Sequence, residues 1–142
     1  MTPVQRLVAD PLRGVVAAIS AATVLTGLVQ LVVPGTVLDL LGAESTATTR
    51  QLFAIVGMFM AVVGGVTLQA LLTEPTPAYV VFWCAVQKLG AFVAVTVGVT
   101  RDLFDSIAMA VALFDLLTAV LAGALWWRLH THDASRREQV LA

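Results

Sequence analysis

Charge is scarce in this chain, and that scarcity indicates the class of protein. Charged residues make up 12% of the 142 residues, whereas hydrophobic residues make up 59% and the mean hydropathy is +0.94. A soluble domain carries about 25% charged and about 45–50% apolar residues. A soluble core of this length cannot hide so much apolar surface, so the composition predicts a protein embedded in a lipid bilayer.

Basic residues, thiols and buried histidines are also few. The formal net charge of −1 disfavours nucleic-acid binding, which requires a basic face. The single cysteine, Cys84, leaves no partner for an intramolecular disulfide or a redox pair. His130 and His132 have no Cys, Asp or Glu in register beside them, so we expect a solvated tail there and no metal site.

Catalytic signatures are missing as well. The sequence contains no Gly-rich phosphate loop, nucleophile elbow or zincin motif, and no histidine within its long apolar runs that could ligate haem. We therefore expect no cofactor, and a non-enzymatic role is favoured over an enzymatic one.

Four long apolar runs are what the sequence does contain, at residues 14–33, 51–73, 78–100 and 106–127. Each reaches the length of about 20 residues that crosses a hydrocarbon core of about 30 Å. A signal peptide is the alternative for 14–33, but this run is longer than a typical signal core and lacks a clear cleavage site. The sequence predicts an all-α integral membrane four-helix bundle over 1–128, followed by a short cytoplasmic tail, 129–142.

The arginines predict the orientation of the four helices. An even number of helices places both termini on one side, and that side carries Arg6, Arg13, Arg128, Arg136 and Arg137. The opposite side carries only Arg50 and Arg101. Basic residues favour the cytoplasmic side, so we expect a multi-pass protein of the inner membrane with both termini in the cytoplasm. Tyr79, Trp126 and Trp127 fall at the same interface, where aromatic rings accumulate.

Two charged residues, Lys88 and Asp115, lie inside the apolar runs. The turn between the third and fourth helices centres near residue 102, about 14 residues after Lys88 and about 13 before Asp115. Both side chains then lie about 20 Å from that turn. A lone charge at this depth costs ~2.5–3.5 kcal/mol on insertion scales. We expect an intramembrane ion pair, or a neutral hydrogen-bonded pair after proton transfer, serving either as a structural pin or as a functional site.

Polar and small residues surround these two charges. We expect an intramembrane polar site formed by Lys88 and Asp115 with Gln87, Thr118, Thr23 and Gln30, although interhelical hydrogen bonding is the favoured role of the first-helix residues. Small residues spaced by four let helices approach closely, and two such ridges are Gly57, Ala61 and Gly65 in the second helix and Gly90, Ala94 and Gly98 in the third.

The stretch "LRGVVAAISAATVLTGLVQLVVP" resembles the first helix of DoxX-like four-helix membrane proteins. It has a basic residue, then small residues, then a Gly-Leu-x-(Lys/Gln)-Leu end before a proline, matched by Gly27, Leu28, Gln30, Leu31 and Pro34. Gln30 stands where lysine is commoner. "RQLFAIVGMFMAVVGG" is similar to the second helix of related bacterial families. The resemblance implies a small inner-membrane protein, often accessory to redox or quinone-linked complexes, and offers no catalytic residues to carry over.

Three functions stay open from the sequence. The favoured one is a non-catalytic accessory or assembly subunit, bound to other membrane subunits or to copies of itself. A second is a small proton-coupled transporter in which Asp115 exchanges a proton or cation and Lys88 tunes it. Small multidrug transporters have a similar number of helices, but their essential acid lies in the first helix, which has none here. The third, a quinone- or lipid-binding module of a membrane oxidoreductase, is implied by the resemblance alone.

Overall fold

A computed structural model describes the backbone of residues 2–141 and the side chains of residues 2–131. This part of the chain contains no strand and forms six helices: α1 (Pro3–Ala9), α2 (Pro11–Val32), α3 (Pro34–Leu40), α4 (Ala47–Leu72), α5 (Ala78–Thr100) and α6 (Ala108–Leu141). Four of them, α2, α4, α5 and the Ala108–Thr131 part of α6, are long and apolar enough to cross a membrane. The predicted all-α class and the four apolar helices of spanning length are confirmed.

The helix boundaries follow from local signals. Pro11 and Pro34 occupy first-turn positions of α2 and α3, where the missing N–H of proline costs nothing. Thr46 caps α4 through a reciprocal bond with Thr49, which satisfies free N–H groups of the first turn. At the other end of the chain, α6 continues to Leu141, so the segment expected as a tail begins as an extension of the last apolar helix.

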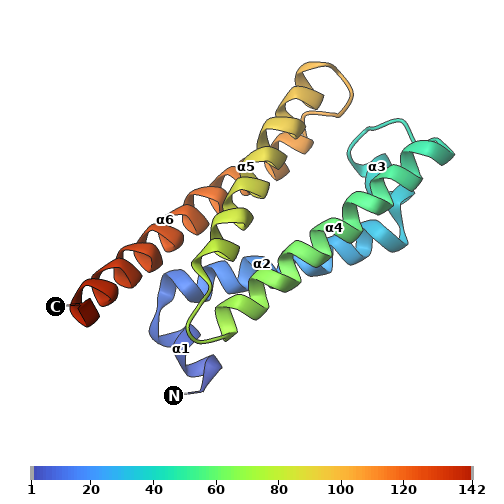
Figure 1. The fold of residues 1–142 in the computed structure, drawn as a ribbon. Helices are drawn as coiled ribbons and strands as arrows, with labels where there is room; N and C mark the ends of the chain where they lie inside the picture. The colour runs from blue at the N-terminus through green and yellow to red at the C-terminus, as the bar shows by residue number, and fades with distance from the viewer. Residues whose placement is uncertain (1, 142) are drawn as a thin grey trace.

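The four long helices pair as two antiparallel hairpins. α2 packs along α4 and α5 packs along α6, whereas contacts between the two hairpins are much sparser. Figure 1 shows the hairpins diverging from the end that carries α1. Two closely packed pairs therefore meet over a limited area, and the space between them is where a site can form.

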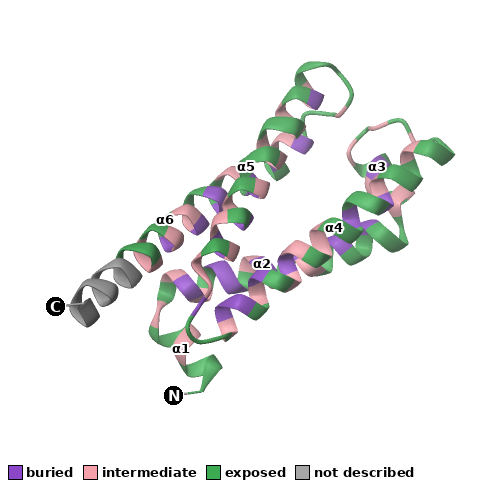
Figure 2. Ribbon diagram, viewed as in Figure 1, coloured by how far each residue is buried: buried purple, intermediate pink, exposed green. Residues whose placement is uncertain are grey.

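The hairpins meet in an apolar core at the end that carries α1. All four long helices contribute to it, through Val16, Ala17, Leu71, Val81, Ala122 and Leu125. Figure 2 shows buried positions gathered where α2, α4 and α5 approach one another near α1. Because this core joins both hairpins, it fixes their relative position at this end.

Arg13 strengthens this junction. Its Nε donates to the carbonyl oxygen of Leu71 at 3.0 Å, and Nη1 donates to Glu74 at 2.9 Å. Leu71 lies in the last turn of α4, where carbonyl groups lack intrahelical partners. We call the polar group around Arg13 the terminal ionic cluster; its members are Arg6, Asp10, Arg13, Glu74, Thr76 and Arg128.

The opposite end of the molecule is joined more lightly. The backbone N–H of Asp105, in the α5–α6 connection, donates to the carbonyl oxygen of Leu41 at 2.8 Å. Gly42 follows with a φ of +65°, and a Cβ at that position would overlap the Asp105 carboxylate. The two hairpins are thus joined by the apolar core at the end that carries α1 and by this contact between connecting segments at the other end.

Candidate functional site

Lys88 and Asp115 meet between α5 and α6. The Lys88 Nζ donates to Asp115 Oδ1 at 2.7 Å, and the two side chains are 4% and 10% exposed. Lys88 lies about 10 residues from the start of α5 and about 12 from its end, which places it roughly 15 Å from the start and 18 Å from the end. The structure therefore brings the two charges together near the middle of an apolar helix.

A face of small residues lets α6 come close enough for this contact. Ala108, Ala112, Ala119 and Ala122 are all buried and lie three or four residues apart in register with Asp115. Residues at this spacing share one face of a helix. The alanines allow close packing against α5, and Asp115 is the one charged group on the face.

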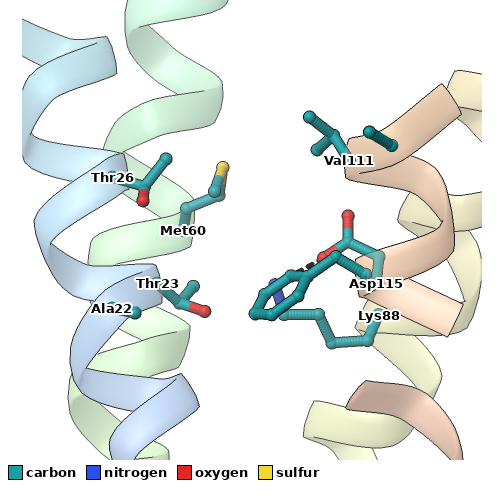
Figure 3. A pocket seen from close by; sticks show the side chains of 9 residues that line it. Ala22, Thr23, Thr26, Met60, Lys88, Val111 and Asp115 are labelled. Atoms are coloured by element: carbon teal, nitrogen blue, oxygen red, sulfur yellow. Dashed lines mark hydrogen bonds and ion pairs between the residues drawn. The ribbon is translucent and has the colours of Figure 1, made fainter. Parts of the chain in front are cut away.

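The pair opens onto a cavity between the two hairpins. The cavity has a volume of about 340 Å³, and its lining residues are Ala22, Thr23, Thr26, Met60, Lys88, Ala110, Val111, Phe114 and Asp115. Figure 3 shows Lys88 and Asp115 on the α5–α6 wall, with Thr23, Thr26 and Met60 facing them from α2 and α4. Ligand sites commonly occupy about 300–1,000 Å³ and combine apolar walls with a few polar groups, and this cavity has both properties.

Thr23 is the buried polar residue that faces the pair from the other hairpin, whereas Thr26, which also lines the cavity, is exposed. Thr23 is 5% exposed, and its hydroxyl has no hydrogen-bond partner among the described residues. The hydroxyls of three other buried residues, Ser20, Thr67 and Thr118, each donate to a carbonyl of their own helix at 2.8 Å, whereas the buried hydroxyl oxygen of Thr96 also has no partner. Figure 3 shows the Thr23 hydroxyl directed towards Lys88.

The other three expected polar residues lie elsewhere. Gln30 donates to the carbonyl oxygen of Phe53 at 3.0 Å and so links α2 to α4. Thr118 is bonded within α6. Gln87 does not line the cavity, and its buried Oε1 has no partner. Of the six expected residues, the structure gathers Lys88, Asp115 and Thr23 around one cavity.

The small-residue ridge of α4 packs through a slightly different set of positions than expected. Gly57 and Ala61 lie against Gly27, and a Cβ on Gly57 would come within 2.6 Å of the Gly27 carbonyl oxygen. Gly64 continues this face, whereas a Cβ on Gly65 would meet nothing within 4 Å. Gly65 lies about 100° around the helix from Gly64, which removes it from the α2 interface.

The ridge expected on α5 does not pack against another helix of the described chain. Gly90 and Ala94 are exposed, and Gly98 packs against Phe104 of the following connection. Gly90 lies about 200° around the helix from Lys88. Since α5 turns its Lys88 face towards α6, the Gly90 face is left outside.

Some lining residues were not anticipated from the sequence. Thr26 lies three residues after Thr23, so helical spacing alone could have added it to the site. Met60 and Phe114 are apolar residues within apolar helices, and no signal distinguishes them from lipid-facing neighbours. Among the described residues, no group of three or more His, Cys, Asp or Glu could hold a metal ion.

Comparison of this chain with protein-family models, with curated proteins and with solved structures finds no match. The role of the chain must therefore be inferred from its own geometry.

Proposed function

We propose that this chain is a non-catalytic multi-pass protein of the bacterial inner membrane that binds a small lipid-soluble molecule, a quinone or a lipid, between its hairpins. In this proposal it serves as an accessory subunit of a larger membrane complex. The observation that carries the binding role is the buried Lys88–Asp115 pair, which opens onto a cavity across from the unpartnered Thr23 hydroxyl.

The pair has hydrogen-bonding capacity that the protein leaves unused. A lysine ammonium has three donors and a carboxylate has two acceptor oxygens, whereas the contact between Lys88 and Asp115 uses one of each. Hydrogen bonds are stronger in surroundings of low dielectric constant, and the remaining lining is mostly apolar. A molecule with one polar end and an apolar body fits such a site.

The accessory role rests on the absence of a catalytic constellation among the described residues and on the outer face of α5. Gly90 and Ala94 are exposed there, and small residues on a membrane helix let another helix approach closely. This face suits another subunit or a second copy of the chain. The resemblance to DoxX-like proteins favours the same role, and purification in mild detergent without any co-purifying partner would count against it.

Proton-coupled transport is a second candidate, favoured by the position of the cavity. The cavity lies between two hairpins that share a large core at one end only, an arrangement in which one hairpin can rock against the other. Asp115 would exchange the proton and Lys88 would tune it. Proteoliposomes that show no substrate uptake under an imposed pH gradient would exclude transport and leave the binding role intact.

For orientation, we propose a four-helix bundle with both termini in the cytoplasm. The arginines support it, because five lie near the two termini and two lie at the opposite side. Tyr79 and Trp127, which are 69% and 63% exposed, are placed as interfacial rings are, a property shared by both membrane interfaces. In a Cys84→Ala background, cysteines introduced at Glu44 and Asp102 should react with an impermeant reagent added to intact cells, and a cysteine at Ser135 should not. The reverse pattern of labelling would overturn the orientation.

The binding role is tested on protein purified from membranes in mild detergent. Native mass spectrometry should show the chain with a bound lipid-soluble molecule, and the double variant Lys88→Met/Asp115→Leu should lose it while remaining folded. The matched control is Thr67→Val, a buried position in α4 away from the cavity, which should keep the ligand. Equal occupancy in the double variant and in the unmodified chain would contradict the proposal.

A further inference from the structure

We propose that the cavity selects an uncharged head group bearing a hydroxyl, which accepts from Lys88, donates to Asp115 and contacts Thr23 across the cavity. This inference rests on the binding role proposed above and specifies the chemistry of the ligand. The shared chemistry, a neutral hydroxyl on an apolar body, is found in diacylglycerols and in quinols.

The charge balance of the lining excludes charged head groups. One cation and one anion line the cavity, paired at 2.7 Å, and the other seven lining residues are uncharged. A phosphate or an ammonium group would bring a net charge into an apolar site with no free counter-charge, which is strongly unfavourable. A phosphate would also be repelled by the Asp115 carboxylate.

The hydrogen-bonding groups around the cavity match a hydroxyl. Asp115 bonds Lys88 through Oδ1, and Figure 3 shows its other carboxylate oxygen directed towards Val111 along the cavity wall. That oxygen can only accept, whereas the two remaining Lys88 N–H groups can only donate. A hydroxyl both donates and accepts, so a single such group can use both partners.

Thr23 supplies the contact from the opposite hairpin. Thr23 is 5% exposed as a residue, its hydroxyl is directed towards Lys88 (Figure 3), and no hydrogen bond within the described residues uses this hydroxyl. A ligand oxygen held by Lys88 and Asp115 would lie in front of it. Thr23 is therefore a residue of the α2–α4 hairpin that takes part in recognition.

The size of the cavity restricts which part of a ligand it can hold. Its volume of about 340 Å³ equals that of about 11 water molecules, enough for a glycerol head or a single ring. Long chains must extend from the cavity into the bilayer. The ligand is thus expected to enter head first, with its tail left among lipids.

The test compares probes that differ in one group, using the full chain in detergent and native mass spectrometry to measure binding. Dioleoylglycerol and dioleoylphosphatidic acid share their acyl chains and differ in the phosphate. Decylubiquinol and decylubiquinone differ in the two hydroxyl groups. We expect at least one hydroxyl probe to bind about tenfold or more tightly than its matched partner, and the tighter of the two hydroxyl probes identifies the source of the ligand.

Two substitutions locate this selectivity in the cavity. Thr23→Val should weaken the preferred hydroxyl probe by about three- to tenfold, the usual range for one lost hydrogen bond, whereas Thr67→Val should leave it unchanged. Asp115→Asn removes the negative charge and leaves Lys88 as an unpaired cation, so it should shift the preference towards phosphatidic acid.

The two proposals fail in distinguishable ways. Phosphatidic acid binding to the unmodified chain as tightly as the hydroxyl probes would overturn the neutral-ligand inference and leave the binding role standing. If the unmodified chain binds none of the four probes and carries no molecule from the membrane, the binding role itself is lost. Should Asp115→Asn fail to fold, the unmodified chain and the Thr23→Val variant still decide the inference.

Discussion

The two hairpins of this protein differ in the contacts that hold their helices together. In the α2–α4 hairpin, Gly27 and Gly57 bring two backbones together so closely that a Cβ on either would come within 2.6 Å of the other's carbonyl oxygen. In the α5–α6 hairpin, Gly90 and Gly123 have open space around them, alanines of α6 are buried in their place, and the buried polar contact is the Lys88–Asp115 pair. One hairpin is thus held by direct contact of two backbones at glycine, and the other by alanine packing together with a charged pair.

The difference explains where a site can form. Apolar side chains gain little by leaving lipid for a helix interface, so membrane helices associate through close packing and polar contacts. Glycine packing holds the α2–α4 interface, where the Gln30 amide donates to the Phe53 carbonyl. The Lys88–Asp115 pair of the α5–α6 hairpin keeps donors and acceptors that can serve a ligand, and it supplies the charged groups of a cavity that both hairpins line.

The largest expected effect is the loss of one charge from the α5–α6 hairpin. Lys88→Met or Asp115→Leu strands the other charge in an apolar interior, which typically costs ~3–5 kcal/mol, whereas replacing both partners by apolar residues is close to neutral. The free energy of unfolding, measured by denaturing-detergent titration in mixed micelles, should therefore fall in each single variant and recover in the double variant.

This cycle also separates structure from function. Single-variant penalties that simply add in the double variant would mean that the two side chains do not interact, and the contact between α5 and α6 would be misplaced. A double variant as stable as the unmodified chain but without ligand would assign the pair a functional role instead of a purely structural one.

The next effect concerns the glycine-closed hairpin. Gly57→Ala places a Cβ against the backbone of α2, at 2.6 Å from the Gly27 oxygen and 2.8 Å from the Leu31 nitrogen, and overpacking of this kind costs about 1–3 kcal/mol. Gly65→Ala is the matched control in the same helix, because its Cβ meets nothing within 4 Å. Helix propensity should make the control neutral or more stable by up to about 1 kcal/mol. Equal stability of the two variants would show that α2 and α4 are not in backbone contact.

Sequence reasoning anticipated the parts of this fold that depend on distance along one helix. Lys88 and Asp115 were paired by counting residues from a single turn, and the helix rise fixes depth to within a residue or two. The same counting along one helix predicts Thr23 and Gln30 as interior polar residues of the first helix, and both are buried.

Features that depend on the packing of distant segments were not anticipated. In the sequence, Arg13 indicates only the orientation of the helices. Its partners Leu71 and Glu74 lie 58 and 61 residues away, and no local sequence pattern predicts these contacts. The ridge at Gly90 and Ala94 was expected inside because small residues suit an interface, but one helix cannot turn both this face and the Lys88 face towards α6. The cavity depends on how the two hairpins are positioned relative to each other, and the sequence of a single helix does not predict that arrangement.

The smallest expected effect is the loss of the polar contact inside the glycine-closed hairpin. Gln30 donates to the Phe53 carbonyl, and Phe53 lies within α4, where that carbonyl keeps its helical hydrogen bond. Gln30→Met therefore strands no group, unlike either charge substitution, and should cost about 0.6 kcal/mol, the average for interhelical hydrogen bonds in membranes, and at most about 1.7 kcal/mol. Gln69→Met, an exposed position in α4, is the matched control and should change the free energy of unfolding very little. If Gln30→Met lowered the free energy of unfolding as much as Lys88→Met does, the Gln30 amide would have to bond to more groups than the Phe53 carbonyl. The α2–α4 hairpin would then depend on a polar contact as strongly as the α5–α6 hairpin does.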